Sequence, residues 1–210
     1  MDLSSTAVGA TVSTIGSAPD DATLMLRYRK GEVRAFEMLY ERHKGSLYRY
    51  LLRLCRSQEV ANDLFQEVWS KVIASRERYE VRAKFTTFLF HIAHNCAIDH
   101  FRRAGRPQEK GAQDVDALVD ELSGPGHESP DAVLSEAQLR ADFKRALDEL
   151  PAEQRDVFLL YEETGLGLED IGRITGVAME TAKSRLRYAL SKLRGSLRQH
   201  QSPTLQSSVS

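Results

Sequence analysis

The stretch LEDIGRITGVAMETAKSRLRYALSKL, residues 168–193, decides the fold of this chain. Its pattern predicts a short helix from about Leu168 to Thr175 and a second helix from Met179 to about Arg198, joined by a tight turn at Gly176. Glycine suits this turn because it readily adopts the left-handed conformation that ends many helices. Gly172 is small where two helices must approach closely. The predicted buried stripe of the second helix consists of Ala182, Leu186, Leu190, Leu193 and Leu197.

The opposite side of the second helix is polar and basic. It carries Thr181, Lys183, Ser184, Arg185 and Arg187, with Glu180 beside them. A helix-turn-helix places such a helix in the DNA major groove with its N-terminal end first. There, Arg and Lys read guanine or hold phosphate, and Ser and Thr contact either. The alternative interpretation is an ordinary helical hairpin with a basic, solvated face.

Helical periodicity also runs through the N-terminal half. Apolar residues from Phe36 to Leu54 recur at helical steps, which places them on one face of a long helix. Further helices are predicted from about Gln58 and from about Thr86. A C-terminal helix begins near Leu150-Pro151, since proline is well placed in a first turn. No segment has strand periodicity, so we predict an all-α fold.

The distribution of charge divides the chain into parts. Residues 22–106 hold 17 Lys and Arg against 9 Asp and Glu, a net charge of +8, whereas residues 107–138 have a net charge of −7. The acidic segment contains Gly124-Pro125-Gly126 and little periodicity, which favours a flexible linker. Basic surfaces on both sides of an acidic connector are typical of a protein that binds an anionic partner through two separate domains. Solvated helix faces would give the same composition. The predicted parts are a disordered tail over 1–21, a helical domain over 22–106, the linker over 107–138, a second helical domain over 139–198 and a disordered tail over 199–210.

The overall composition excludes several classes of protein. Apolar residues make up 41% and charged residues 28% of the chain, as in ordinary globular proteins. No stretch approaches the apolar length of a membrane span, and the N-terminus lacks the features of a secretory signal. Cys55 and Cys96 each stand alone in a predicted helix, and nothing requires an oxidising compartment. We therefore expect a cytoplasmic protein without membrane insertion.

Two blocks of the chain resemble a known family. The block from Leu150–Arg155 to Thr181–Leu186, with its stretches EDIG (169–172) and TAKSR (181–185), resembles region 4 of the sigma-70 family. Segments 36–54, 61–68 and 85–103 resemble region 2 of that family, in the correct order. The resemblance covers about 145 of the 210 residues. Because no middle domain separates the two blocks, the chain is similar to the extracytoplasmic-function (ECF) group.

This resemblance implies a function, partners and site residues. A sigma factor is a non-enzymatic transcription protein that needs no cofactor, binds core RNA polymerase and recognises promoter DNA; an anti-sigma factor or another regulator would be a further partner. Core polymerase would be bound by Asp63, Leu64, Gln66 and Glu67. The opened minus-ten element would be bound by Arg76, Arg78, Tyr79, Lys84, Asn95, Arg102 and Arg103. The minus-thirty-five element would be read by Thr181, Lys183, Ser184, Arg185 and Arg187.

The residues themselves support part of this assignment. Segment 76–85 mixes aromatic and basic side chains, and such mixtures bind single strands because aromatics stack on unpaired bases while cations follow phosphates. The competing interpretation is that Tyr79, Phe85, Phe88 and Phe90 belong to the core, and for Phe88 we favour it. The polar face around Asp63 could bind a basic surface of a partner protein. An ordinary solvent-exposed face would have the same residue composition.

Two rival functions use other features of the sequence. A stand-alone helix-turn-helix regulator would bind DNA without polymerase, but it leaves the N-terminal block unexplained. A metal-dependent helical enzyme would use His91, His94, Asp99 and His100, of which the first two are one turn apart. No Glu stands between them in a zinc-protease arrangement, and the chain has no Gly-rich phosphate loop or nucleophile elbow.

Overall fold

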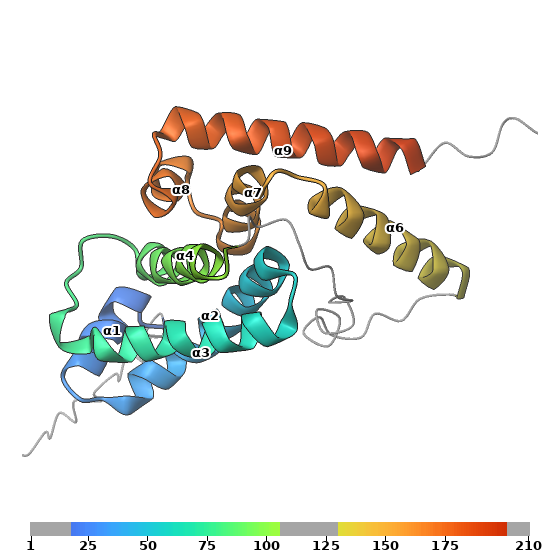
Figure 1. Ribbon diagram of the computed structural model, residues 1–210. Helices are drawn as coiled ribbons and strands as arrows, with labels where there is room; N and C mark the ends of the chain where they lie inside the picture. Colours follow the sequence, from blue (N-terminus) through green and yellow to red (C-terminus); the bar gives the residue numbers. More distant parts are fainter. Residues whose placement is uncertain (1–17, 106–129, 201–210) are drawn as a thin grey trace, which may run out of the picture.

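The computed structural model describes the backbone of residues 18–105 and 130–200 and the side chains of residues 18–105 and 138–196. These residues form helices and no strand, which confirms the predicted all-α class. We call residues 18–105 the N-terminal unit and residues 130–200 the C-terminal unit (Figure 1). The N-terminal unit contains α1 (Asp21–Arg29), α2 (Val33–Cys55), α3 (Gln58–Ala74), the 3-10 helix η1 (Arg76–Arg78) and α4 (Phe85–Arg103). The C-terminal unit contains α6 (Pro130–Asp148), α7 (Ala152–Thr164), α8 (Leu168–Thr175) and α9 (Met179–His200).

Local signals in the sequence fix where the helices begin and end. The Ser57 side chain accepts a hydrogen bond from the backbone N–H of Val60 and so caps the start of α3. Gly176 ends α8 in the left-handed conformation, with φ +69°, as its sequence predicted. A Cβ atom on Gly172 would lie 2.8 Å from the carbonyl oxygen of Val177. Gly172 therefore lies very close to other backbone atoms, as the sequence predicted. The backbone that it approaches is the turn between α8 and α9.

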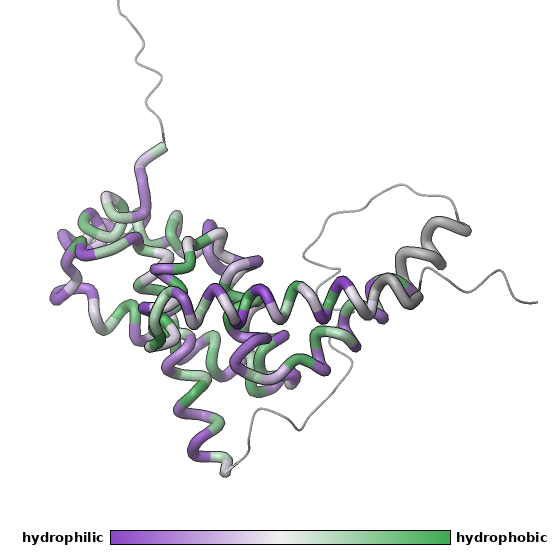
Figure 2. The backbone as a smooth tube through the Cα atoms, turned by 90° about the horizontal axis from the view of Figure 1, so that it is seen from above, coloured by the Kyte–Doolittle hydropathy of each residue, from purple (hydrophilic) through white to green (hydrophobic). Residues whose placement is uncertain are grey.

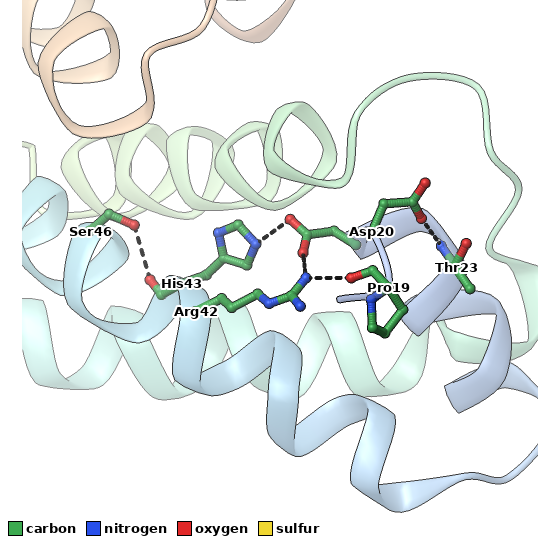
Figure 3. Close-up of polar contacts among 7 residues, drawn as sticks. Pro19, Asp20, Thr23, Arg42, His43 and Ser46 are labelled. Carbon is green, nitrogen blue, oxygen red and sulfur yellow. Dashed lines mark hydrogen bonds and ion pairs between the residues drawn. The ribbon is translucent and has the colours of Figure 1, made fainter. Parts of the chain in front are cut away.

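A polar cluster fastens α1 to α2 (Figure 3). The Asp21 carboxylate lies 2.8 Å from Nη1 of Arg42 and 2.7 Å from Nε2 of His43. Arg42 also donates to the carbonyl oxygen of Pro19 at 2.8 Å. These contacts hold the first described residues of the chain against the N-terminal half of α2, so α1 completes one side of the N-terminal unit.

One cluster of buried apolar residues runs through both units. Leu39 and Leu51 of α2 and Phe90 of α4 are fully buried in the N-terminal unit. Ile171 of α8 and Ala182 of α9 are fully buried in the C-terminal unit. Hydrophobic and hydrophilic segments alternate along the helices, which shows the one-sided pattern from which the fold was predicted (Figure 2).

The boundary between linker and C-terminal unit differs from the prediction. The linker was expected to extend to Gln138, but α6 already begins at Pro130. The helix-forming run Ala132–Gln138 explains the difference, since alanine, leucine, glutamate and glutamine favour helix even in an acidic segment. The rest of the predicted linker, residues 107–129, lies outside the described residues, as do the two predicted tails apart from residues 18–21 and 199–200.

The two units pack against each other. Helix α2 contacts α7, and α4 contacts α8, so the middle of the molecule is formed by both units (Figure 1). Helix α9 lies along one outer side, and α1, α2 and α3 gather on the other (Figure 1). The sequence predicted two units but did not predict their contact, and this contact determines which candidate surfaces are open.

Candidate nucleic-acid and polymerase interfaces

The outward face of α9 carries the side chains predicted to read DNA. Thr181, Lys183 and Arg187 are exposed, and Ser184 and Arg185 are half-buried. The stripe behind them is buried at Ala182, Leu186 and Leu193, as predicted, while Leu190 is partly buried. The side chain of Leu197 lies outside the described residues.

The basic residues of α9 are held in different ways. Nη2 of Arg185 lies 2.8 Å from the Glu153 carboxylate at the start of α7, so this guanidinium has a fixed direction. The Arg187 guanidinium lies over the Tyr188 ring, 5.3 Å from its centroid. Tyr188 itself is 57% exposed. Helix α9 therefore carries an exposed aromatic ring beside Arg187, together with the cations of Lys183 and Arg185, which are side chains of the kinds that bind nucleic acid.

A second candidate site is a pocket of about 450 Å³ beside η1. Its lining combines aromatic, hydroxyl and cationic groups from both units. The lining residues are Ser75, Arg78, Tyr79, Glu80, Arg82, Ala83, Thr87, Phe88, His91, Arg173 and Ile174. Arg78 and Arg82 are exposed at the pocket, whereas Tyr79 and Thr87 are only 5% and 6% exposed.

The hydroxyl groups of Tyr79 and Thr87 are buried, and neither has a hydrogen-bond partner among the described residues. A buried hydroxyl without a partner costs about 1–3 kcal/mol of folding free energy, so each such group calls for an explanation. Burial also raises the pKa of Tyr79, and Asp21 and Asp20 raise it further, which keeps its hydroxyl protonated and able to donate. Two residues of the pocket lining thus carry hydroxyls without a partner, and two, Tyr79 and Phe88, carry aromatic rings.

The structure places the predicted minus-ten residues in and around this pocket. Arg78 and Tyr79 line it, while Arg76 stacks over the Tyr28 ring at 5.5 Å and Lys84 is exposed at the start of α4. Phe88, which was expected in the core, is half-buried and lines the pocket.

The remaining minus-ten candidates follow α4 away from the pocket. Asn95 is exposed and lies 3.4 Å from the His91 ring. Arg102 pairs with the Asp99 carboxylate at 3.0 Å, and Arg103 donates to the Asp99 carbonyl oxygen. Both arginines are exposed, so their pairing with Asp99 is a surface interaction that phosphate can replace.

Sequence reasoning missed several residues of the pocket. Arg82 and Thr87 lie within or next to the basic and aromatic segment, so that signal was sufficient to find them. Arg173 and Ile174 come from α8 and reach the pocket only because the two units pack together. No local pattern in the sequence indicates that contact.

The predicted polymerase-binding face lies on α3. Asp63 and Gln66 are exposed, as a binding surface requires. Glu67 pairs with Lys71 at 2.7 Å, and this hydrogen bond lowers the pKa of Glu67. Leu64 is only 2% exposed, so its assignment as a polymerase contact is corrected: it belongs to the core and supports the helix from within.

The histidines of the rival metal hypothesis do not converge in the described residues. His94 lies 3.0 Å from the Asp156 carboxylate of α7, whereas His91 is exposed beside Asn95. Over residues 18–105 and 138–196, no three His, Cys, Asp or Glu side chains are grouped as metal ligands would be. Within the described part of the chain, no helix has the length and hydropathy of a membrane span.

A helix-turn-helix with an exposed basic helix, joined to a helical unit with a basic and aromatic pocket, defines a two-part DNA-binding protein. Comparison with known proteins agrees. The family model for Sigma-70 region 2 matches residues 39–107, and the model for Sigma-70 region 4 matches residues 146–195. The chain therefore belongs to the sigma-70 family of RNA polymerase sigma factors, in its ECF group, and its function is promoter recognition with RNA polymerase.

Individual relatives show how far the similarity extends. The chain is 33% identical over 172 residues to the RNA polymerase sigma factor CarQ of Myxococcus xanthus, which covers 81% of this chain and 93% of CarQ. It is also 33% identical over 174 residues to the ECF RNA polymerase sigma factor SigE of Mycolicibacterium smegmatis, and spans 65% of that relative's length. The sigma factor RpoE, solved in complex with the anti-sigma factor NepR from Bartonella quintana, superposes with a TM-score of 0.58 at 25% identity, over 78% of this chain and 96% of RpoE.

Proposed function

We propose that three separate surfaces of this chain each carry out one part of the function of a sigma factor. The polar face of α3, with Asp63, Gln66 and Glu67, docks on core polymerase. The pocket beside η1 and the exposed side of α4 hold the opened minus-ten strand, and the outward face of α9 reads the minus-thirty-five element. The chain acts as a binding subunit without catalysis of its own, in the cytoplasm where polymerase works. An anti-sigma factor is the class of regulator that we propose for it, by analogy with the RpoE–NepR complex.

The pocket is the observation that carries the minus-ten assignment. An unpaired base that leaves the duplex needs an aromatic surface to stack on and hydrogen-bonding groups for its edge. Phe88 and Tyr79 supply rings, and the two buried hydroxyls supply unused donors and acceptors. Arg78 and Arg82 supply positive charge for the phosphates on either side. A base in this pocket would satisfy these hydroxyls once the side chains of Tyr79 and Thr87 turn toward it, because both oxygens are buried in this structure.

The test removes the two hydroxyls without changing the shape of the pocket. We expect Tyr79→Phe with Thr87→Val to weaken promoter opening by the holoenzyme roughly tenfold, because about 1–2 kcal/mol of hydrogen bonding to the base is lost. The same variant should be as stable as the wild type or more stable, since two unsatisfied groups leave the interior. Permanganate footprinting measures the first quantity and denaturant unfolding measures the second.

Thr86→Val is the matched control, because Thr86 is adjacent and does not line the pocket. It should leave promoter opening unchanged. Full promoter opening by the double variant would remove the pocket from the proposed minus-ten site.

A further inference from the structure

Helix α1 contacts the segment that forms the minus-ten pocket. It packs on η1 as well as on α2 and α4, although η1 lies far along the chain from it. Helix α1 also lies before residue 39, where the match to the Sigma-70 region 2 model begins. The family match therefore says nothing about what α1 does, and its contacts must be read from the structure.

Arg29, the last residue of α1, reaches the chain just after η1. Its Nη1 atom donates a hydrogen bond of 3.0 Å to the carbonyl oxygen of Tyr79. Tyr79 is the residue that follows η1, and it lines the pocket. Because the guanidinium is charged, this hydrogen bond is stronger than one between two neutral groups. Arg29 thus holds the backbone of a pocket residue and leaves its side chain unbound.

A second contact joins α1 to the start of η1. The Arg76 guanidinium lies over the Tyr28 ring, 5.5 Å from its centroid. Tyr28 is buried, and its ring lies 4.9 Å from the Phe36 ring of α2. The two sides of η1 are therefore attached to consecutive residues of α1, Tyr28 and Arg29, while α1 itself is anchored on α2.

The first turn of α1 is also fixed in place. The Asp21 carboxylate pairs with Arg42 and His43 of α2 (Figure 3). The His43 ring in turn lies 5.3 Å from the Phe85 ring at the start of α4. Helix α1 is thus attached to the rest of the N-terminal unit near both of its ends, as a helix must be if it is to hold another segment in position.

Residues 79–84, which connect η1 to α4, have little regular structure of their own. Among the backbone hydrogen bonds of the described residues, one lies within this segment, from the N–H of Arg82 to the carbonyl oxygen of Glu80 at 2.9 Å. A segment with few internal contacts samples several conformations unless neighbouring elements hold it. The hydrogen bond from Arg29 holds it at Tyr79, the residue where it begins.

We propose that Arg29 is a positioning residue for minus-ten recognition, which keeps the wall of the pocket in the form that accepts a base by holding the backbone of Tyr79. This inference rests on the proposed function for what the pocket binds. The Tyr79 side chain can still turn toward a base, because Arg29 binds only the carbonyl group. A pocket that is already formed binds more tightly than one that must first be ordered, since ordering uses part of the binding free energy.

The first experiment removes the hydrogen bond. Arg29→Met keeps a long side chain that cannot donate. It should weaken promoter opening by the holoenzyme roughly fivefold, because the competent form of the pocket becomes less populated. Arg29→Lys supplies a charged donor again and should recover most of the opening. Permanganate footprinting on genomic fragments that the wild-type holoenzyme transcribes measures both variants, and core-polymerase binding should be unchanged in both.

Arg27→Met is the matched control, because it makes the same change on the same helix. The Arg27 guanidinium pairs with Glu32 and not with the pocket segment. That pair lies on the surface, where an ion pair contributes little to stability. Promoter opening should therefore be unchanged in Arg27→Met. An equal loss of opening in Arg27→Met and Arg29→Met would overturn the inference, because it would attribute the effect to charge alone.

The salt dependence separates positioning from direct contact with DNA. Arg29 is exposed, and an exposed arginine is also able to bind a phosphate. Loss of a phosphate contact lowers the slope of log affinity against log salt by about one counterion. A positioning residue leaves this slope unchanged, so we expect equal slopes for Arg29→Met and wild type. A lower slope in Arg29→Met would make Arg29 a DNA contact and overturn the inference.

The second experiment observes the segment in the absence of DNA. A nitroxide is attached to Val81→Cys, because Val81 is 53% exposed and does not line the pocket. Its paramagnetic resonance spectrum should show greater mobility in Arg29→Met than in wild type or Arg29→Lys. A nitroxide on Glu59→Cys, at the exposed start of α3, should show no change. Chains with neither added cysteine measure the background from Cys55 and Cys96.

Full promoter opening by Arg29→Met, or equal mobility of the Val81→Cys label in Arg29→Met and wild type, would overturn the inference. Failure of the proposed function is distinguishable from this. If Tyr79→Phe with Thr87→Val opens promoters fully, the pocket is not the minus-ten site and the inference falls with it. The nitroxide would still show whether Arg29 holds the segment.

Discussion

At the scale of single residues, two arginines of α9 are expected to do different work. Arg185 is held by Glu153 and lies in the N-terminal half of the helix, where a helix-turn-helix contacts base edges. We expect Arg185→Ala to cost about 1–3 kcal/mol of promoter binding and to relax preference at one minus-thirty-five position. Arg187→Ala should weaken binding to all sequences alike and lower the salt slope by about one counterion. Holoenzyme affinity across single-base variants at several salt concentrations measures both effects, and an exchange of the two outcomes would mean that α9 is rotated in the groove.

Cys55, the last residue of α2, is a second residue whose behaviour follows from its surroundings. Burial raises the pKa of its thiol to about 12, although the charge of Arg155 acts in the opposite direction. Since only the thiolate reacts, a thiol with that pKa is reactive in roughly one molecule in ten thousand at pH 8. We expect native Cys55 to resist alkylation. It should react much faster in Glu163→Arg, because that change sets a third positive charge against Arg49 and Arg53 and loosens the packing of α7 on α2.

Cys96 is the internal control for this measurement. It is fully buried between α3 and α4, inside the N-terminal unit, and burial raises its pKa as well. Peptide mass spectrometry after timed alkylation should therefore show slow labelling of Cys96 in both proteins. Equal acceleration at both thiols would indicate general unfolding of the variant, and acceleration at neither would show that the contact between α2 and α7 does not protect Cys55.

At the scale of elements, two helical glycines differ in what an added methyl group would meet. A Cβ at Gly172 in α8 would lie 2.8 Å from the Val177 carbonyl oxygen, whereas at Gly195 in α9 nothing lies within 4 Å. Gly172→Ala should therefore destabilise the C-terminal unit by about 1–3 kcal/mol, because backbone must move. Gly195→Ala should be neutral or stabilise by up to about 1 kcal/mol, from helix propensity alone. Denaturant unfolding compares the two, and a Gly172→Ala protein as stable as Gly195→Ala would contradict the close approach.

The elements were predictable because their signals are local. Helix α8 occupies Leu168–Thr175 and α3 begins at Gln58, as their apolar patterns, Gly176 and the Ser57 cap indicate. The start of α6 was misplaced because acidic composition was taken as evidence for a linker. In the pocket, Arg78 and Tyr79 were predictable from the mixture of basic and aromatic residues, but the contribution of α8 depends on contacts between residues far apart in sequence.

At the scale of the whole molecule, basic residues have two roles that the sequence cannot distinguish: binding nucleic acid and pairing with acidic residues of the other unit. The net charge of +8 over residues 22–106 was interpreted as a surface for nucleic acid. Three of those cations, Arg49, Arg53 and Arg56, are instead paired with Glu163 and Asp148. A paired and an unpaired arginine look alike in sequence, so the net charge overstates the positive charge that the surface offers to nucleic acid.

The association of the two units gives a prediction for the intact chain. The sequence of segment 107–129 has few apolar anchors, so limited proteolysis is expected to cut there. After cleavage, two domains that do not interact would elute separately. In this chain, the contacts between α2 and α7 should keep the two fragments together in size-exclusion chromatography at low salt. Salt should weaken this association because the partly exposed arginine pairs are screened. Fragments that elute separately from nicked wild type at low salt would contradict the association of the two units. Co-elution in wild type with separation in Glu163→Arg would show that the pairs of Glu163 with Arg49 and Arg53 hold the units together.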